Sequence, residues 1–139
     1  MELHELRVLV EQDSQIDDTQ LDTESLRLPA LHNKYLNFYH DAKLRYEKAT
    51  NEYNRLYRLK WEYYTGKIDQ ETLDKKGWEP FQHNILKQDI PIFMNSDEDL
   101  CKRKEVITYI KSIVEYLEEV VKEITFRHTK IKNAIEWRK

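Results

Sequence analysis

Residues 106–124, VITYIKSIVEYLEEVVKEI, decide the fold, because their apolar side chains recur in steps of three and four. This spacing predicts an α-helix whose apolar face keeps a heptad repeat. Upstream, Ser96 followed by Asp99 has the pattern of a capping box, and no glycine or proline follows before the C-terminus. We therefore predict a long amphipathic helix over residues 96–139.

The apolar face of this predicted helix is wider than one antiparallel neighbour needs. We therefore expect self-association through it, and the alternative is burial of the whole face inside one chain against the central helix. His128 stands at an apolar position of the repeat and is expected to be packed. The predicted assembly residues are Ile107, Ile110, Ile113, Val114, Leu117, Val120, Val121, Ile124, Ile131 and Ile135.

A second long helix is expected in the middle of the chain. Residues 31–65 contain no glycine or proline, their apolar residues keep a helical spacing, and Gly66 follows. Such a helix would be about 50 Å long, so it must pack against another long helix or project. Its beginning lies near Asp18 or Thr19, with a kink or a restart at Pro29.

The remaining segments complete a mainly α fold in a single helical domain. A short helix is predicted near the N-terminus, from the apolar spacing after Leu3. Residues 68–95 contain Gly77, Pro80 and Pro91 and are expected to form an irregular connector with one or two short strands, one of them near residues 90–94. The expected division is therefore an N-terminal region 1–67, a connector 68–95 and an oligomerisation helix 96–139.

The net charge of −3 hides a strong segregation along the chain. Residues 1–26 carry eight acids and one base, or −7, and residues 27–67 carry nine bases and four acids, or +5. The rest has thirteen bases and fourteen acids. The acidic arm can meet a basic partner or remain solvated, and the basic middle is the candidate for binding an anion.

Residue patterns for catalysis or metal binding are missing from the sequence. The five histidines do not have the spacing of zinc ligands, and no phosphate loop, dinucleotide fingerprint or nucleophile elbow occurs. Cys101 is followed by Lys102, Arg103 and Lys104, cations that can activate a thiol, but no pattern marks a general base or an oxyanion hole for it. We therefore expect a binding or assembly protein that is not an enzyme and has no cofactor. A single cysteine, no signal peptide and no membrane-spanning apolar run favour the cytoplasm.

The basic middle also contains nine of the sixteen aromatic residues. Bases among aromatics suit single-stranded nucleic acid, because cations bind phosphates and rings stack on bases. On one straight helix, however, Arg58 and Lys60 would point about 160° apart. The tyrosines at 39, 46, 53, 57 and 64 form a stripe that either packs at the edge of a bundle or stacks on bases. The candidate DNA-binding residues are Lys43, Lys48, Arg55, Tyr57, Arg58, Lys60, Trp61, Tyr63, Tyr64 and Lys67.

Residues 57–66, YRLKWEYYTG, resemble the DNA-binding motif of the UvsY recombination mediators of tailed phages. The resemblance extends upstream over Ile16, Asp17, Thr19, Leu21, Glu24, Leu31, Lys34, Tyr35, Leu36 and Asn37. It implies a ring-like homo-oligomer, formed through the C-terminal helix, that binds single-stranded DNA. It further implies that the ring loads a RecA-like recombinase onto strands covered by the phage single-stranded-DNA-binding protein.

By position in that motif, Arg58 and Lys60 would contact phosphates. The order of arginine and lysine is the reverse of the family's usual order, which need not preserve bidentate contacts. Trp61 replaces an aliphatic residue and adds a possible stacking surface. The alternative function is that of a structural coiled-coil assembly protein without nucleic-acid contact.

Overall fold

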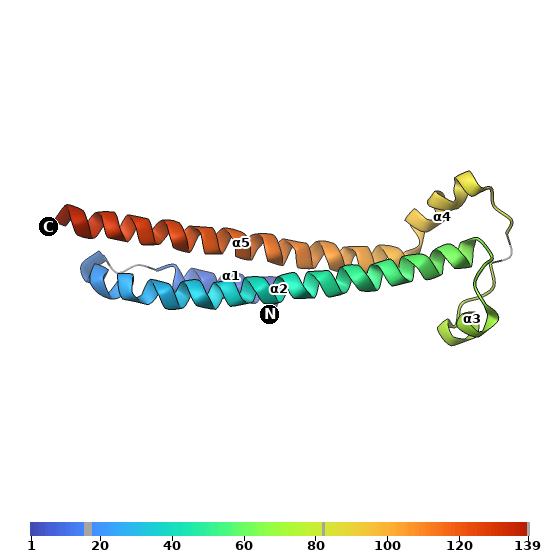
Figure 1. The fold of residues 1–139 in the computed structure, drawn as a ribbon, viewed down its shortest axis with the longest axis horizontal. Coiled ribbons are helices and arrows are strands. Elements are labelled where there is room, and N and C mark those ends of the chain that lie inside the picture. Colours follow the sequence, from blue (N-terminus) through green and yellow to red (C-terminus); the bar gives the residue numbers. More distant parts are fainter. Residues whose placement is uncertain (16–17, 82, 139) are drawn as a thin grey trace. The chain divides into compact units, whose positions relative to one another are not determined.

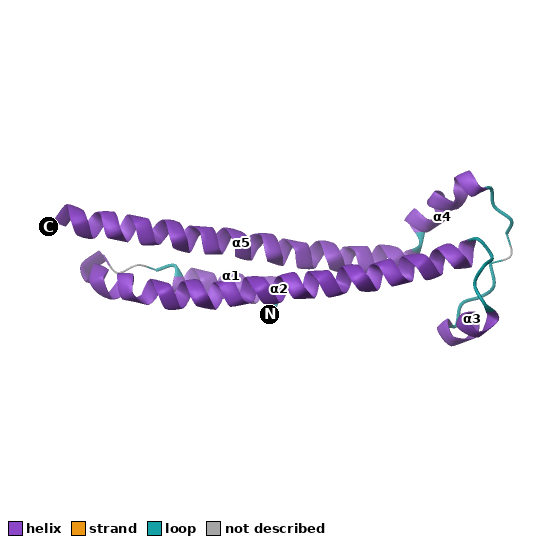
Figure 2. Ribbon diagram, viewed as in Figure 1, coloured by secondary structure: helices purple, strands orange, loops and turns teal. Residues whose placement is uncertain are grey.

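The computed structural model describes residues 1–15, 18–81 and 83–138, so Ile16 and Asp17 of the resemblance lie outside the described residues. The described chain is helical, as predicted (Figures 1 and 2). Its α-helices are α1 (Leu3–Asp13), α2 (Leu21–Tyr64), α3 (Gln70–Lys76), α4 (Ile90–Ser96) and α5 (Glu98–Arg138).

Two compact units make up the chain, and α2 and α5 each run from one unit into the other. Unit 1 consists of Met1–Tyr46 and Tyr109–Lys139, and unit 2 consists of Glu47–Thr108. Unit 1 therefore contains α1, the first half of α2 and most of α5. Unit 2 contains the end of α2, the connector helices and the start of α5, and the candidate DNA-binding motif belongs to it.

The core of unit 1 forms where α1, α2 and α5 meet. Polar contacts at its two ends fix the directions of the helices. Glu2 receives hydrogen bonds from Arg45 and from the Tyr109 hydroxyl, whereas Asp13, at the other end of α1, contacts Lys34 and Arg127. Thus α1 runs parallel to α5, and α2 runs antiparallel to both. The buried core residues are Leu6, Leu21, Leu28, Leu31, Tyr35, Ala42, Ile113, Leu117, Val120, Ile124 and Ile131.

The wide apolar face of α5 has two partners within the chain, because α1 packs on it beside α2. Of the ten predicted assembly residues, Ile110, Ile113, Leu117, Val120, Ile124 and Ile131 are buried in the single chain. Ile107, Val114, Val121 and Ile135 are half-buried. The width of the face therefore no longer argues for a second chain, and self-association stays a prediction.

The buried line on α5 differs from the predicted one at its C-terminal end. His128 is exposed, so the expectation of a packed histidine is wrong, and Arg127 is buried with 6% of its surface exposed. The reason is that burial follows positions 113, 117, 120, 124 and 131, and Arg127 continues this heptad. The Arg127 guanidinium donates to the backbone oxygen of Asp13 at 3.1 Å and so helps to hold the end of α1.

Helix α2 begins at Leu21, directly after a 3-10 turn over Asp18–Gln20, close to the predicted start. It continues through Pro29 without a restart. The helix ends at Tyr64, and Gly66 has a φ of +76°, the left-handed conformation that glycine adopts readily at helix C-termini. The predicted end of the helix at this glycine is confirmed.

The connector contains helices where short strands were expected, and no strand occurs among the described residues. Residues 90–94 look extended in the sequence but form α4, because Pro91 lies in its first turn, where a proline needs no N–H partner.

The predicted cap of α5 is one residue off. Asp97, not Ser96, accepts the Leu100 backbone N–H at 2.9 Å. No described helix is long and apolar enough to span a membrane.

Candidate nucleic-acid interface

The last turns of α2 and the turn beyond them expose a cationic and aromatic surface in unit 2. The Arg58 side chain is 83% exposed and has a weak ion pair with Glu62 at 3.4 Å. Trp61, one turn along, is 37% exposed. The Lys67 ammonium lies 4.6 Å from the centre of the Trp61 ring, a cation–π distance. We call Arg58, Trp61 and Lys67 the α2-end surface.

Four other candidate residues lie at exposed positions of α2. Tyr57 is 43% exposed, and its ring packs loosely on Tyr53 with centroids 6.1 Å apart. Lys48 and Arg55 are exposed in the same unit. Lys43 is also exposed but belongs to unit 1, where its ammonium lies over the Tyr39 ring. Unit 2 therefore contains most of the exposed candidate cations.

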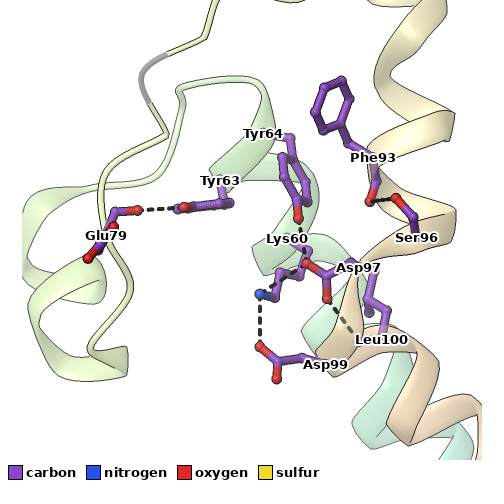
Figure 3. A network of polar contacts seen from close by, with 9 residues as sticks. All are labelled: Lys60, Tyr63, Tyr64, Glu79, Phe93, Ser96, Asp97, Asp99 and Leu100. Atoms are coloured by element: carbon purple, nitrogen blue, oxygen red, sulfur yellow. Dashed lines mark hydrogen bonds and ion pairs between the residues drawn. The ribbon is translucent and has the colours of Figure 1, made fainter.

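Lys60 lies on the other side of α2 and is 5% exposed, whereas Arg58 faces solvent. Its ammonium forms ion pairs with Asp97 at 3.1 Å and Asp99 at 2.9 Å (Figure 3). It also lies 4.0 Å from the centre of the Trp78 ring. Since α2 continues to Tyr64, Arg58 and Lys60 stay on separate faces. In this conformation the Lys60 ammonium faces carboxylates of its own chain.

Asp97 joins the end of α2 to the start of α5. Its carboxylate accepts the Tyr64 hydroxyl at 2.6 Å and the Leu100 backbone N–H at 2.9 Å (Figure 3). Burial alone would raise the pKa of Asp97, but these two hydrogen bonds and Lys60 outweigh it and lower the pKa. Burial and the same hydrogen bond to Asp97 raise the pKa of Tyr64. Asp97 is therefore ionised at neutral pH, and Tyr64 is protonated.

Tyr63 and Tyr64 pack into an aromatic cluster with residues of the connector. The Tyr64 ring lies edge-on to Phe81 at 5.0 Å between centroids and contacts Phe93 at 5.8 Å. Tyr63 contacts Trp78 and Phe81, and its hydroxyl donates to the Glu79 backbone oxygen (Figure 3). Tyr64 therefore has the packing role that was one alternative for the stripe, and Tyr63, which is not part of the stripe, packs in the same cluster.

The partners of Lys60, Tyr63 and Tyr64 are not evident from the sequence. The local sequence could have predicted one role of Asp97, because an aspartate at the start of a helix is a favoured N-cap residue, and Asp97 accepts the Leu100 backbone N–H. No local pattern pairs Asp97 or Asp99 with Lys60, since that contact spans the connector. Within the described residues, no group of three or more histidine, cysteine or acidic side chains could hold a metal ion.

Comparisons with known proteins give one family match and matches in fold to solved structures. The family's sequence model, described as "Recombination, repair and ssDNA binding protein UvsY", matches residues 9–139. A crystal structure of the bacteriophage T4 recombination mediator protein UvsY, lattice type II, matches with a TM-score of 0.86 and 21% identity over 99% of this chain and 96% of that one. The lattice type IV structure matches with a TM-score of 0.86 and 20% identity, over 99% and 98%.

A comparison with curated protein sequences gives no match. At 20–21% identity the crystal structures show that the fold is shared. The family match covers nearly the whole chain and includes α2, the connector and α5. The chain therefore belongs to the UvsY family.

Proposed function

We propose that this chain is a recombination mediator that binds single-stranded DNA through the α2-end surface. In this proposal it promotes loading of a RecA-like recombinase onto strands covered by single-stranded-DNA-binding protein. The observation that carries the proposal is the exposure of Arg58, Trp61 and Lys67 together at one helix end, in a member of this family. Exposed cations bind phosphates, and an exposed indole stacks on bases.

Seven of the ten candidate DNA-binding residues are exposed, and Lys60, Tyr63 and Tyr64 are not. Arg58, Trp61 and Lys67 are accessible without any rearrangement, and Lys48, Arg55 and Tyr57 can extend the contact along α2. Tyr63 and Tyr64 support the helix end from inside the aromatic cluster. A chain with so few accessible cations binds weakly alone. Self-assembly, which the proposal includes, would multiply the contacts, and light scattering of the native protein measures it.

The test is the binding of a fluorescently labelled single-stranded oligonucleotide, measured by anisotropy at several salt concentrations. The double variant Arg58→Ala, Lys67→Ala removes two phosphate contacts. We expect its affinity to fall by about ten- to a hundredfold at low salt, and the slope of log K against log salt to fall by about 1.4, at about 0.7 per contact. Trp61→Ala should weaken binding with little change of slope, because stacking releases no counterions.

The matched control is Lys111→Ala, Lys132→Ala, which makes the same change of charge at exposed positions of α5 in unit 1. This control should retain most of the affinity. Equal losses in both double variants would mean that only overall charge matters, and the α2-end surface would then be the wrong site. Absence of DNA binding by the unmodified protein would favour the structural coiled-coil assembly protein.

A further inference from the structure

The two carboxylates that hold Lys60 differ in burial. The Asp97 side chain is 4% exposed, whereas the Asp99 side chain is 51% exposed. Lys60 therefore has an inner ion pair, closed off from water, and an outer ion pair at the surface. The Trp78 ring covers another part of the ammonium. The Asp99 carboxylate thus occupies the position through which Lys60 reaches the surface.

Asp97 and Asp99 also differ in their other contacts. Asp97 caps α5 and accepts the Tyr64 hydroxyl, so it is held in place without Lys60. For Asp99, Lys60 is the partner in the described part of the chain. The outer ion pair is also the weaker one, because a half-exposed carboxylate is well solvated and loses little when it turns to water. The outer ion pair can therefore open while the inner one remains.

We propose that Asp99 acts as a competing anion against single-stranded DNA: in the free chain its carboxylate occupies the outer position at Lys60, where the family resemblance places a phosphate. Carboxylate and phosphate oxygens accept charge-assisted hydrogen bonds from an ammonium at similar distances. Helix α2 ends one turn beyond Lys60, so a flexible strand bound at Arg58 and Trp61 can pass round the helix end to this site. The inference rests on the proposed DNA binding and adds that Asp99 regulates its affinity.

Asp99 then lowers the affinity for DNA, because each phosphate that binds Lys60 must first displace it. Asp99→Asn removes the competing charge and leaves Lys60 held by Asp97. We expect this variant to bind the oligonucleotide about three- to tenfold more tightly at low salt. The salt slope should steepen by up to about 0.7, because Lys60 then makes in full a phosphate contact with which Asp99 competes in the unmodified chain.

The neighbouring residue gives a matched control. Glu98→Gln makes the same change of charge one residue away, at a side chain that is 82% exposed and pairs with Lys102 instead. Removing any acidic side chain near the DNA raises the affinity slightly, because it makes the local electrostatic potential more positive. The Glu98→Gln variant measures this nonspecific gain. The gain of Asp99→Asn beyond that of Glu98→Gln is the quantity that tests the site.

A second comparison places Asp99→Asn in a Lys60→Met background, with helicity checked by circular dichroism. The extra gain should disappear there, because Asp99 acts through Lys60. Equal gains for Asp99→Asn and Glu98→Gln, or an extra gain that persists without Lys60, would overturn the inference. If Lys60→Met does not fold, the comparison with Glu98→Gln and the salt slope decide alone. Failure of the unmodified protein to bind DNA would instead remove the proposed function itself.

Discussion

The same three residue types meet in both units, an aspartate, a tyrosine and a lysine. In unit 1, Asp13 accepts the Tyr35 hydroxyl at 2.7 Å and the Lys34 ammonium at 2.8 Å. In unit 2, Asp97 accepts the Tyr64 hydroxyl at 2.6 Å and pairs with Lys60 at 3.1 Å. Both clusters fix a helix end by the same chemistry.

The lysines differ in burial, since the Lys34 side chain is 37% exposed and that of Lys60 is 7% exposed. In unit 1 the Asp13 side chain is itself 23% exposed, so this ion pair is in contact with water. In unit 2 a second carboxylate and an indole surround the ammonium. The two ion pairs have similar distances but should contribute differently to stability. Breaking a buried ion pair costs far more free energy than breaking an exposed one, because the charge left behind is not solvated.

Removing each lysine should give the largest difference between the units. We expect Lys60→Met to lower the free energy of unfolding by about 3–5 kcal/mol, because it leaves two carboxylates close together without their cation. Lys34→Met should cost at most about 1 kcal/mol. Urea unfolding, followed by tryptophan fluorescence and by circular dichroism, measures both. Similar losses for the two variants would show that burial does not separate the clusters.

Removing each tyrosine hydroxyl should have a smaller and more equal effect. Tyr35→Phe and Tyr64→Phe each delete one hydrogen bond to a carboxylate, which contributes about 1.5–3 kcal/mol. The same urea titrations apply, with Tyr53→Phe as the control, because Tyr53 contacts Tyr57 through its ring. A much larger loss at Tyr64 would mean that the aromatic cluster depends on its hydroxyl.

Acid should weaken both clusters, with the smallest effect. Burial opposes ionisation of Asp13, but hydrogen bonds from Lys34 and Tyr35 outweigh it and lower the pKa, as happens at Asp97. An aspartate with a lowered pKa stabilises the fold at pH values above about 3.9, which is its pKa in the unfolded chain. This contribution is lost as the pH falls through the pKa of the folded state.

Urea midpoints between pH 7 and pH 3 measure this loss, which should begin near pH 4. Asp97→Asn should flatten the decline seen by tryptophan fluorescence, because Trp61 and Trp78 both belong to unit 2. A midpoint that stays constant down to pH 3 would contradict the lowered pKa values.

The long helices could be predicted from the sequence because their information is local. Apolar spacing and Gly66 define the end of α2, and apolar spacing without an internal glycine or proline defines α5 to within a few residues. The prediction of a strand near residues 90–94 is wrong because a short apolar run suits a strand as well as a helix, and only the position of Pro91 in the first turn separates the two. On α5 the sequence showed a wide apolar face but not that α1 covers part of it.

The candidate site was predictable in its residue types and only partly in its geometry. The 100° rotation per residue correctly separated Arg58 from Lys60. The burial of Lys60 depends on Trp78, Asp97 and Asp99, which follow it by many residues. These contacts form only because the path of the connector brings Trp78, Asp97 and Asp99 back to the end of α2. The spacing of residues within one helix does not predict that path.

The contacts of Asp97 with Lys60 and Tyr64 close the segment 65–96 into a loop with fixed ends. The entropy of closing a loop grows only with the logarithm of its length, so doubling this loop would cost about 0.6 kcal/mol. Related chains can therefore lengthen or rebuild the connector while the end of α2 and the start of α5 stay joined. Sequence divergence within the family should then concentrate between these anchors rather than at them.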